Sequence, residues 1–168
     1  MVHFYDDAPE SIAKLEVRDA VERYAADAGV PLEAIFGLDS EQLRSRPVEG
    51  TWSIQEIVVH LMDTDLIAAY RMKRIIAEDQ PTWDTYDENA FAARLFYNEV
   101  DAVTAAEVFR LNRRCFSSIL RKLPVGAFDR IAHHPDIGEV SLSHLLRLYI
   151  HHLEHHMRFL RKKRLMVE

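Results

Sequence analysis

Apolar residues recur at three- and four-residue intervals through most of this 168-residue chain, and convincing runs of alternating apolar and polar residues are absent. The longest such run begins at Ser53, where Ser53 and Glu56 have the spacing of a capping box, and reaches about Glu78. Its apolar face consists of Ile54, Ile57, Val58, Leu61, Ala68 and Met72. This pattern predicts a long helix with one buried face, and it constrains the fold to a helical class.

Three other stretches have the same period. The first, Val17–Ala28, is interrupted at Gly29-Val30-Pro31, where proline can restart a helix at its first turn. A second stretch has capping-box spacing at Thr104 and Glu107 and should end at Leu123-Pro124. The last should begin at Ser141 or Ser143 and run to about Lys163.

The connections between these stretches complete the predicted architecture. A short helix is expected at Glu88–Phe96, and a loop containing Pro135 and Gly138 should precede the last helix. We therefore expect an all-α fold. It is a four-helix bundle with a broken N-terminal helix and a short extra helix in the connection after helix 2. A single domain should cover residues 1–168.

Composition excludes several classes of function. The formal net charge of -6 argues against broad electrostatic binding of nucleic acid, and the single cysteine, Cys115, rules out an intramolecular disulfide framework. Met1–Glu10 carries acids where a signal peptide needs a basic start, and no apolar run is long enough for a membrane span. These features predict a cytoplasmic protein with no membrane partner.

Five of the nine histidines lie between His144 and His156, where two His-x-x-x-His pairs overlap. Helical phase places His152 and His156 on the core stripe with Leu145, Tyr149 and Phe159. The same phase puts His151 and His155 on a solvent face with His144, Arg147, Arg158 and Lys162. Two inward imidazoles one turn apart need polar partners, which a metal ion would supply. Core histidines bonded to protein groups, or a surface cluster without a function, are the alternatives.

A third ligand should come from another helix, and His60 is the candidate. Three histidines with open coordination positions are typical of a catalytic metal site. Asp63, one turn along from His60, is the candidate carboxylate that orients an imidazole, holds a bound water or accepts a proton, with a solvated surface position as the alternative. Tyr149 is the candidate hydroxyl at the pocket wall, with a plain core role as the alternative. Arg71 would form a surface ion pair or bind a substrate anion.

Three separated segments resemble the signature of the DinB-like (YfiT-like) family: Arg46–Asp63, Arg71–Pro81, and Ser141 to His156 with its closing His-x-x-His-His. The resemblance covers about Ala20 to Arg164. It implies a four-helix bundle, commonly dimeric, in which His60, His152 and His156 hold a divalent ion, usually zinc or nickel. Characterised members of the family include transferases and isomerases that use low-molecular-weight thiols, and others are described as metal-dependent hydrolases.

Residues and resemblance together predict a metal-dependent enzyme acting on a small molecule, by thiol S-transfer or by hydrolysis. A low-molecular-weight thiol would be the co-substrate in the first case. The alternative is a non-catalytic metal-binding or dimeric assembly module. A homodimer is expected in either case.

Overall fold

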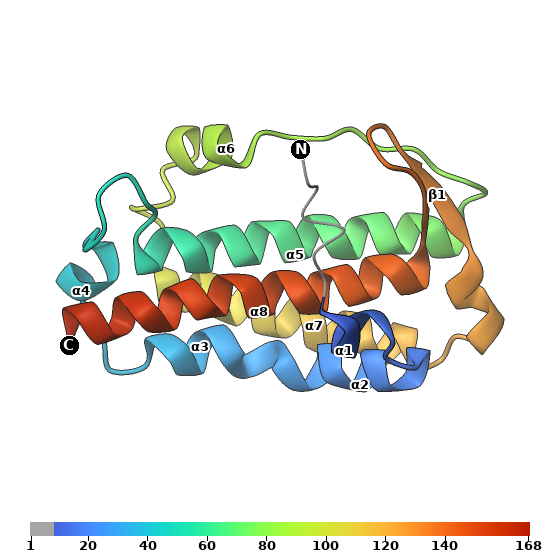
Figure 1. Cartoon of the computed structure of the whole chain (residues 1–168), viewed down its shortest axis with the longest axis horizontal. Coiled ribbons are helices and arrows are strands. Elements are labelled where there is room, and N and C mark those ends of the chain that lie inside the picture. The colour runs from blue at the N-terminus through green and yellow to red at the C-terminus, as the bar shows by residue number, and fades with distance from the viewer. Residues whose placement is uncertain (1–8) are drawn as a thin grey trace.

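A computed structural model describes residues 9–168 and contains four helical rods packed side by side (Figure 1). The rods are α2 with its continuation α3, then α5, α7 and α8. Their bounds are α2 Val17–Ala26, α3 Val30–Ile35, α5 Ile54–Ala77, α7 Ala102–Leu120 and α8 Leu142–Val167. A 3-10 turn at Asp27–Gly29 joins α2 to α3, so the broken first helix is confirmed along with the four-helix bundle.

Shorter elements connect the rods. They are α1 Glu10–Ala13, α4 Ser40–Arg44, α6 Glu88–Arg94, a 3-10 turn at Val125–Asp129, and the strands β1 Ile131–His134 and β2 Gly138–Ser141. The extra helix after α5 is confirmed, whereas the loop expected before α8 is wrong because that segment forms an antiparallel hairpin. Each strand has four residues, too few for an alternating pattern to be evident, and the turn uses Gly138 at φ 77°.

The segment that connects the end of α5 to the start of α7 crosses the length of the bundle. In Figure 1, α5 and α7 run in one direction and α8 runs in the other, so the segment after α5 must return along the bundle. Residues 78–101 make this return and carry α6 with them. The crossing segment thereby lies over the outer side of α5.

Side-chain caps fix the ends of the long helices. The Ser53–Glu56 capping box is confirmed, since Glu56 Oε2 accepts from Ser53 N at 2.7 Å and Ser53 Oγ accepts from Glu56 N at 3.1 Å. The box expected at Thr104 is wrong: Asp101 caps α7 by accepting from Thr104 N at 2.7 Å. The last helix begins after Ser141, whose hydroxyl accepts from His144 N.

The buried apolar residues form two clusters, one toward each end of the bundle. On α5 the change of cluster falls between Leu61 and Ala68, and on α8 it falls between Ile150 and Leu153. Six buried polar residues of α5, α7 and α8 lie in or next to this interval: His60, Thr64, Asp65, Arg113, His151 and His152. The other buried polar residues of these helices lie nearer their ends: Gln55, Glu56, Arg71, Ser117 and Lys163. A polar layer therefore crosses the middle of the bundle.

One half of this layer is a buried ion pair. Arg113 Nε donates to Asp65 Oδ1 at 2.8 Å, and both side chains are 1% exposed. Asn112 Nδ2 and the hydroxyl of Tyr24 also donate to the Asp65 carboxylate, while Arg113 Nη2 donates to the main-chain oxygen of Tyr149 at 2.9 Å. The network thus joins α2, α5, α7 and α8.

None of the helices in the described part of the chain is long and apolar enough to cross a bilayer. Most of the acidic start, on which the prediction of a cytoplasmic location partly rests, lies outside the described residues.

Asp65→Asn should lower the free energy of unfolding by about 3–5 kcal/mol, because it leaves the buried Arg113 guanidinium without a counter-charge. Urea unfolding followed by circular dichroism measures the loss. Glu22→Gln is the matched control: it removes the carboxylate of an exposed ion pair with Arg121 and should leave stability nearly unchanged. Equal effects of the two substitutions would contradict a structural role for the buried pair.

Candidate metal centre

Three imidazoles from two helices converge in the other half of the polar layer. His60 comes from α5, and His152 and His156 come from α8, one turn apart. His60 Nε2 lies 3.2 Å from His152 Nε2 and 3.1 Å from His156 Nε2, and one ring nitrogen from each of the three lies within 4.8 Å of the others. The structure brings together the three histidines that sequence analysis selected.

The predicted faces of α8 are partly wrong. His151 is buried at 3% exposure although it was placed on the solvent face, and Phe159 is 49% exposed although it was placed on the core stripe. The reason is that α8 also packs against α1 and α2, so its buried surface is wider near its start than one stripe. His155 is half-buried, with its ring centroid 5.3 Å from that of His156.

Burial keeps the three imidazoles neutral. It lowers the pKa of His60 to about 4, and burial together with the nearby His60 and His155 lowers the pKa of His156 to about 2. The pKa of His152 lies well below its usual value, because of burial and then because of its two neighbours in the cluster. A neutral imidazole carries a lone pair on one ring nitrogen. At neutral pH the three histidines can therefore bind a metal ion without first losing a proton.

The donor set fits a divalent transition metal. Two nitrogen ligands at 2.0–2.1 Å from a tetrahedral zinc ion lie about 3.3 Å apart, close to the two spacings around His60 Nε2. Imidazole suits zinc and nickel, whereas calcium and magnesium prefer oxygen ligands. Among the described residues no carboxylate belongs to this ligand group.

Trp52, at the start of α5, covers one side of the cluster. Its ring is stacked on that of His156 with an interplanar angle of 10° and centroids 6.2 Å apart, and it lies 4.7 Å from the ring of His60. These ring contacts restrict the orientations that the His60 and His156 imidazoles can adopt.

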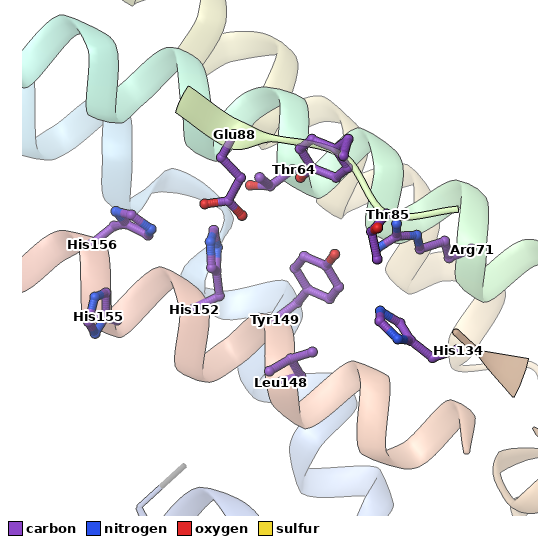
Figure 2. A pocket seen from close by; sticks show the side chains of 11 residues that line it. Thr64, Arg71, Thr85, Glu88, His134, Leu148, Tyr149, His152, His155 and His156 are labelled. Atoms are coloured by element: carbon purple, nitrogen blue, oxygen red, sulfur yellow. The ribbon is translucent and has the colours of Figure 1, made fainter. Parts of the chain in front are cut away.

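A cavity of about 290 Å³ lies on another side of the cluster (Figure 2). Helix α5 contributes Thr64 and Arg71, and the crossing segment contributes Thr85, Tyr86 and Glu88. The remaining wall comes from His134 of β1 and from α8, with Leu148, Tyr149, His152, His155 and His156. A small molecule entering this cavity would meet two of the three candidate ligands.

The other residues that were predicted for the site lie in different environments. Tyr149 is in the cavity wall, its ring centroid 5.8 Å from that of His152. Asp63 is not among the cavity-lining residues of the described chain; it accepts a hydrogen bond from the hydroxyl of Tyr97 at 2.5 Å, and its catalytic role stays a prediction. The surface ion pair expected for Arg71 is wrong, because Arg71 is buried and lines the cavity.

Glu88 is the cavity residue that sequence analysis missed. It lies on the first turn of α6, and Figure 2 shows its carboxylate directed toward His152. Desolvation by its surroundings and the neighbouring Asp87 raise the pKa of Glu88 above its usual value. No local pattern distinguishes this placement, since an acidic residue in a first helical turn is ordinarily explained by the helix dipole.

Fold and site together define a helical-bundle protein with a three-histidine candidate metal centre. A family model described as the DinB superfamily matches residues 31–160, so the chain belongs to this superfamily. The family predicted from the motifs is confirmed.

Known relatives agree with this assignment. A protein of Oceanobacillus iheyensis is 29% identical over 123 residues, which are 73% of this chain and 71% of the relative. YfiT of Bacillus subtilis is 27% identical over 126 residues, 74% of this chain and 71% of the relative. The names of both propose metal-dependent hydrolase activity. The solved structure of YfiT, described as a four-helix bundle of unusual topology, has a TM-score of 0.82 at 24% identity and covers 92% of this chain and 89% of its own.

The metal-free protein should lose stability as the pH falls from about 6.5 toward 4. Unfolded histidines bind protons near pH 6.5, whereas the folded pKa of His60 is about 4, so in this range the unfolded state binds more protons. Each such histidine adds up to about 1.4 kcal/mol per pH unit to the slope of the unfolding free energy against pH. Urea unfolding of chelator-treated protein at several pH values measures the slope.

His60→Gln should make this pH dependence shallower, because it removes one of the protons that only the unfolded state binds. The wild-type protein, measured over the same pH range, is the reference for this slope. A slope in His60→Gln as steep as that of the wild type would show that His60 is not held neutral by burial.

Proposed function

We propose that this protein is a divalent-metal-dependent enzyme acting on a small molecule, with His60, His152 and His156 as ligands and zinc or nickel as the ion. The observation that carries the proposal is the convergence of three neutral imidazoles beside a cavity, two from the buried His60 and His152 and one from the half-buried His156. The names of the relatives from Oceanobacillus iheyensis and Bacillus subtilis support the same class of activity.

A bound divalent ion supplies a Lewis acid that lowers the pKa of a water or thiol ligand and so provides a nucleophile at neutral pH. Around it, the residues of the chain would hold and orient the substrate. Tyr149 stands next to His152 in the cavity wall, where a phenol can donate a hydrogen bond to substrate. The carboxylate of Glu88, directed toward His152, is placed to accept a proton near the reacting atoms.

Hydrolysis is the first candidate reaction, supported by the names of the relatives. Transfer of a low-molecular-weight thiol to an electrophile is the second candidate, because characterised members of the family that the three sequence motifs resemble include thiol-dependent transferases. The two differ only in which nucleophile reaches the ion, and the cavity of about 290 Å³ has room for a small molecule in either case.

A non-catalytic metal-binding or assembly module is the competing explanation. A structural metal site is closed by four protein ligands, whereas this cluster has three histidines and an adjacent cavity. The cavity therefore favours the enzyme. The homodimer, the cytoplasmic location and the lack of nucleic-acid partners stay predictions.

Tag-free protein should bind about one divalent transition-metal ion per chain, and His152→Gln should weaken this binding about 100-fold, because two histidines hold an ion far less tightly than three. Metal analysis and competition with a chromogenic chelator give stoichiometry and affinity. His151→Gln is the matched control on the neighbouring position of α8 and should leave both unchanged. Equal losses in the two variants would show that the ligand set is wrong.

The reaction class is tested with metal-loaded protein, a chromogenic ester and a thiol-reactive electrophile, each with and without a small thiol. A hydrolase should turn over the ester without thiol, and a transferase should turn over the electrophile only when thiol is present. In either case His156→Gln should reduce turnover at least 100-fold, because it removes a ligand. Metal-loaded protein that is inactive toward both classes of substrate would favour the non-catalytic module.

A further inference from the structure

We propose that Arg71 binds an anionic group of the substrate, a carboxylate or a phosphate, at the end of the cavity away from the histidines. The inference rests on the proposed function, because it names the substrate class of the same site.

Arg71 extends from α5 into the wall of the cavity and is 5% exposed. Its guanidinium carbon lies 5.3 Å from the ring centroid of Trp83 and 5.8 Å from that of Tyr86. Its Nη2 donates to the main-chain oxygen of Asp84 at 2.9 Å. The side chain is thus held in one orientation by two aromatic rings and one carbonyl of the crossing segment.

The charge of Arg71 lacks a carboxylate partner within residues 9–168. No ion pair within 4.0 Å involves Arg71, whereas Arg113, the other buried arginine of the described chain, has Asp65 at 2.8 Å. A buried guanidinium that is not paired is costly, and its remaining donors match the oxygens of a carboxylate or phosphate in a two-point contact. A cation retained in this state beside a cavity indicates that its counter-ion comes with the ligand.

The cavity has ends of opposite character (Figure 2). Arg71 lies beside Thr85 at one end with His134 nearby, and Glu88 lies with His152 and His156 at the other. In the metal-free protein the carboxylate of Glu88 repels an anionic group from the histidine end, whereas the guanidinium of Arg71 attracts it to the other end; a bound metal ion would offset the charge of Glu88. The substrate class is then a small molecule with an oxyanion at one end and its reacting group at the other.

The test uses the full chain, with and without bound metal, titrated calorimetrically with inorganic phosphate and with propionate. Wild-type protein should bind at least one of these anions saturably below about 10 mM, and Arg71→Gln should weaken that binding at least tenfold. Binding of phosphate alone, of propionate alone, or of both identifies the group that the site accepts. Absence of binding for both anions would overturn the proposal.

Two further variants control for charge and folding. Arg74→Gln removes an arginine of the same helix that already pairs with Glu78 at 2.7 Å, so it should bind anions like the wild type. Arg71→Lys keeps the charge but loses the two-point contact, so its affinity should lie between those of the wild type and Arg71→Gln. Should Arg71→Gln fail to fold, unchanged affinity in Arg71→Lys would overturn the two-point contact.

This outcome is separable from the proposed function. Anion binding that depends on Arg71 in both the metal-free and the metal-loaded protein supports the inference, even if the loaded protein shows no turnover. Metal binding by the three histidines together with anion binding that is unaffected by Arg71→Gln would leave the proposed function standing and remove the anion site.

Discussion

The buried pair of Asp65 and Arg113 fixes how the four rods of the bundle lie relative to one another. A guanidinium and a carboxylate at 1% exposure are stable in the core only while each keeps its hydrogen-bond partners, so the pair resists any sliding of α5 against α7. Its outer contacts extend this constraint to α2 through the hydroxyl of Tyr24 and to α8 through the main-chain oxygen of Tyr149. The helices that carry the two apolar clusters are held in register by this one polar layer.

The candidate metal centre depends on that register. His60 lies five residues before Asp65 on α5, and His152 lies three residues after Tyr149 on α8, so both lie close along their helices to an anchored position. A displacement of α8 by one turn would move its histidines by about 5.4 Å, far more than the 3.1 and 3.2 Å that separate their Nε2 atoms from that of His60. The ion pair therefore positions the histidines, although neither Asp65 nor Arg113 is among the cavity-lining residues of the described chain.

The features that could be predicted from the sequence are those that depend on interactions within a single helix. The capping box at Ser53 and the apolar face of α5 lie within one helix, so the extent of α5 could be predicted, and helical phase placed His152 and His156 inward. The burial of His151 could not be predicted, because it arises from α1 and α2 packing on α8, segments about 130 residues away. The cap at Asp101 was missed for a different reason: Thr104 and Glu107 offered an equally valid local alternative, but it is the carboxylate of Asp101 that accepts from Thr104 N.

The same distinction separates the metal centre from the part of the site that selects a ligand. The three histidines lie on long helices with strong periodicity, whereas Thr85, Tyr86 and Glu88 reach the cavity from a crossing segment whose path follows from the parallel arrangement of α5 and α7. Thr85 and Glu88 of this segment are exposed and can vary without disturbing the helical core, whereas its Trp83, Ala92 and Tyr97 belong to the buried apolar clusters. Arg71 joins the two parts: it belongs to α5, yet its orientation depends on the rings of Trp83 and Tyr86 and on the carbonyl of Asp84. Within a single cavity, the bundle thus determines where the metal ligands meet, and the crossing segment determines which chemical group can lie opposite them.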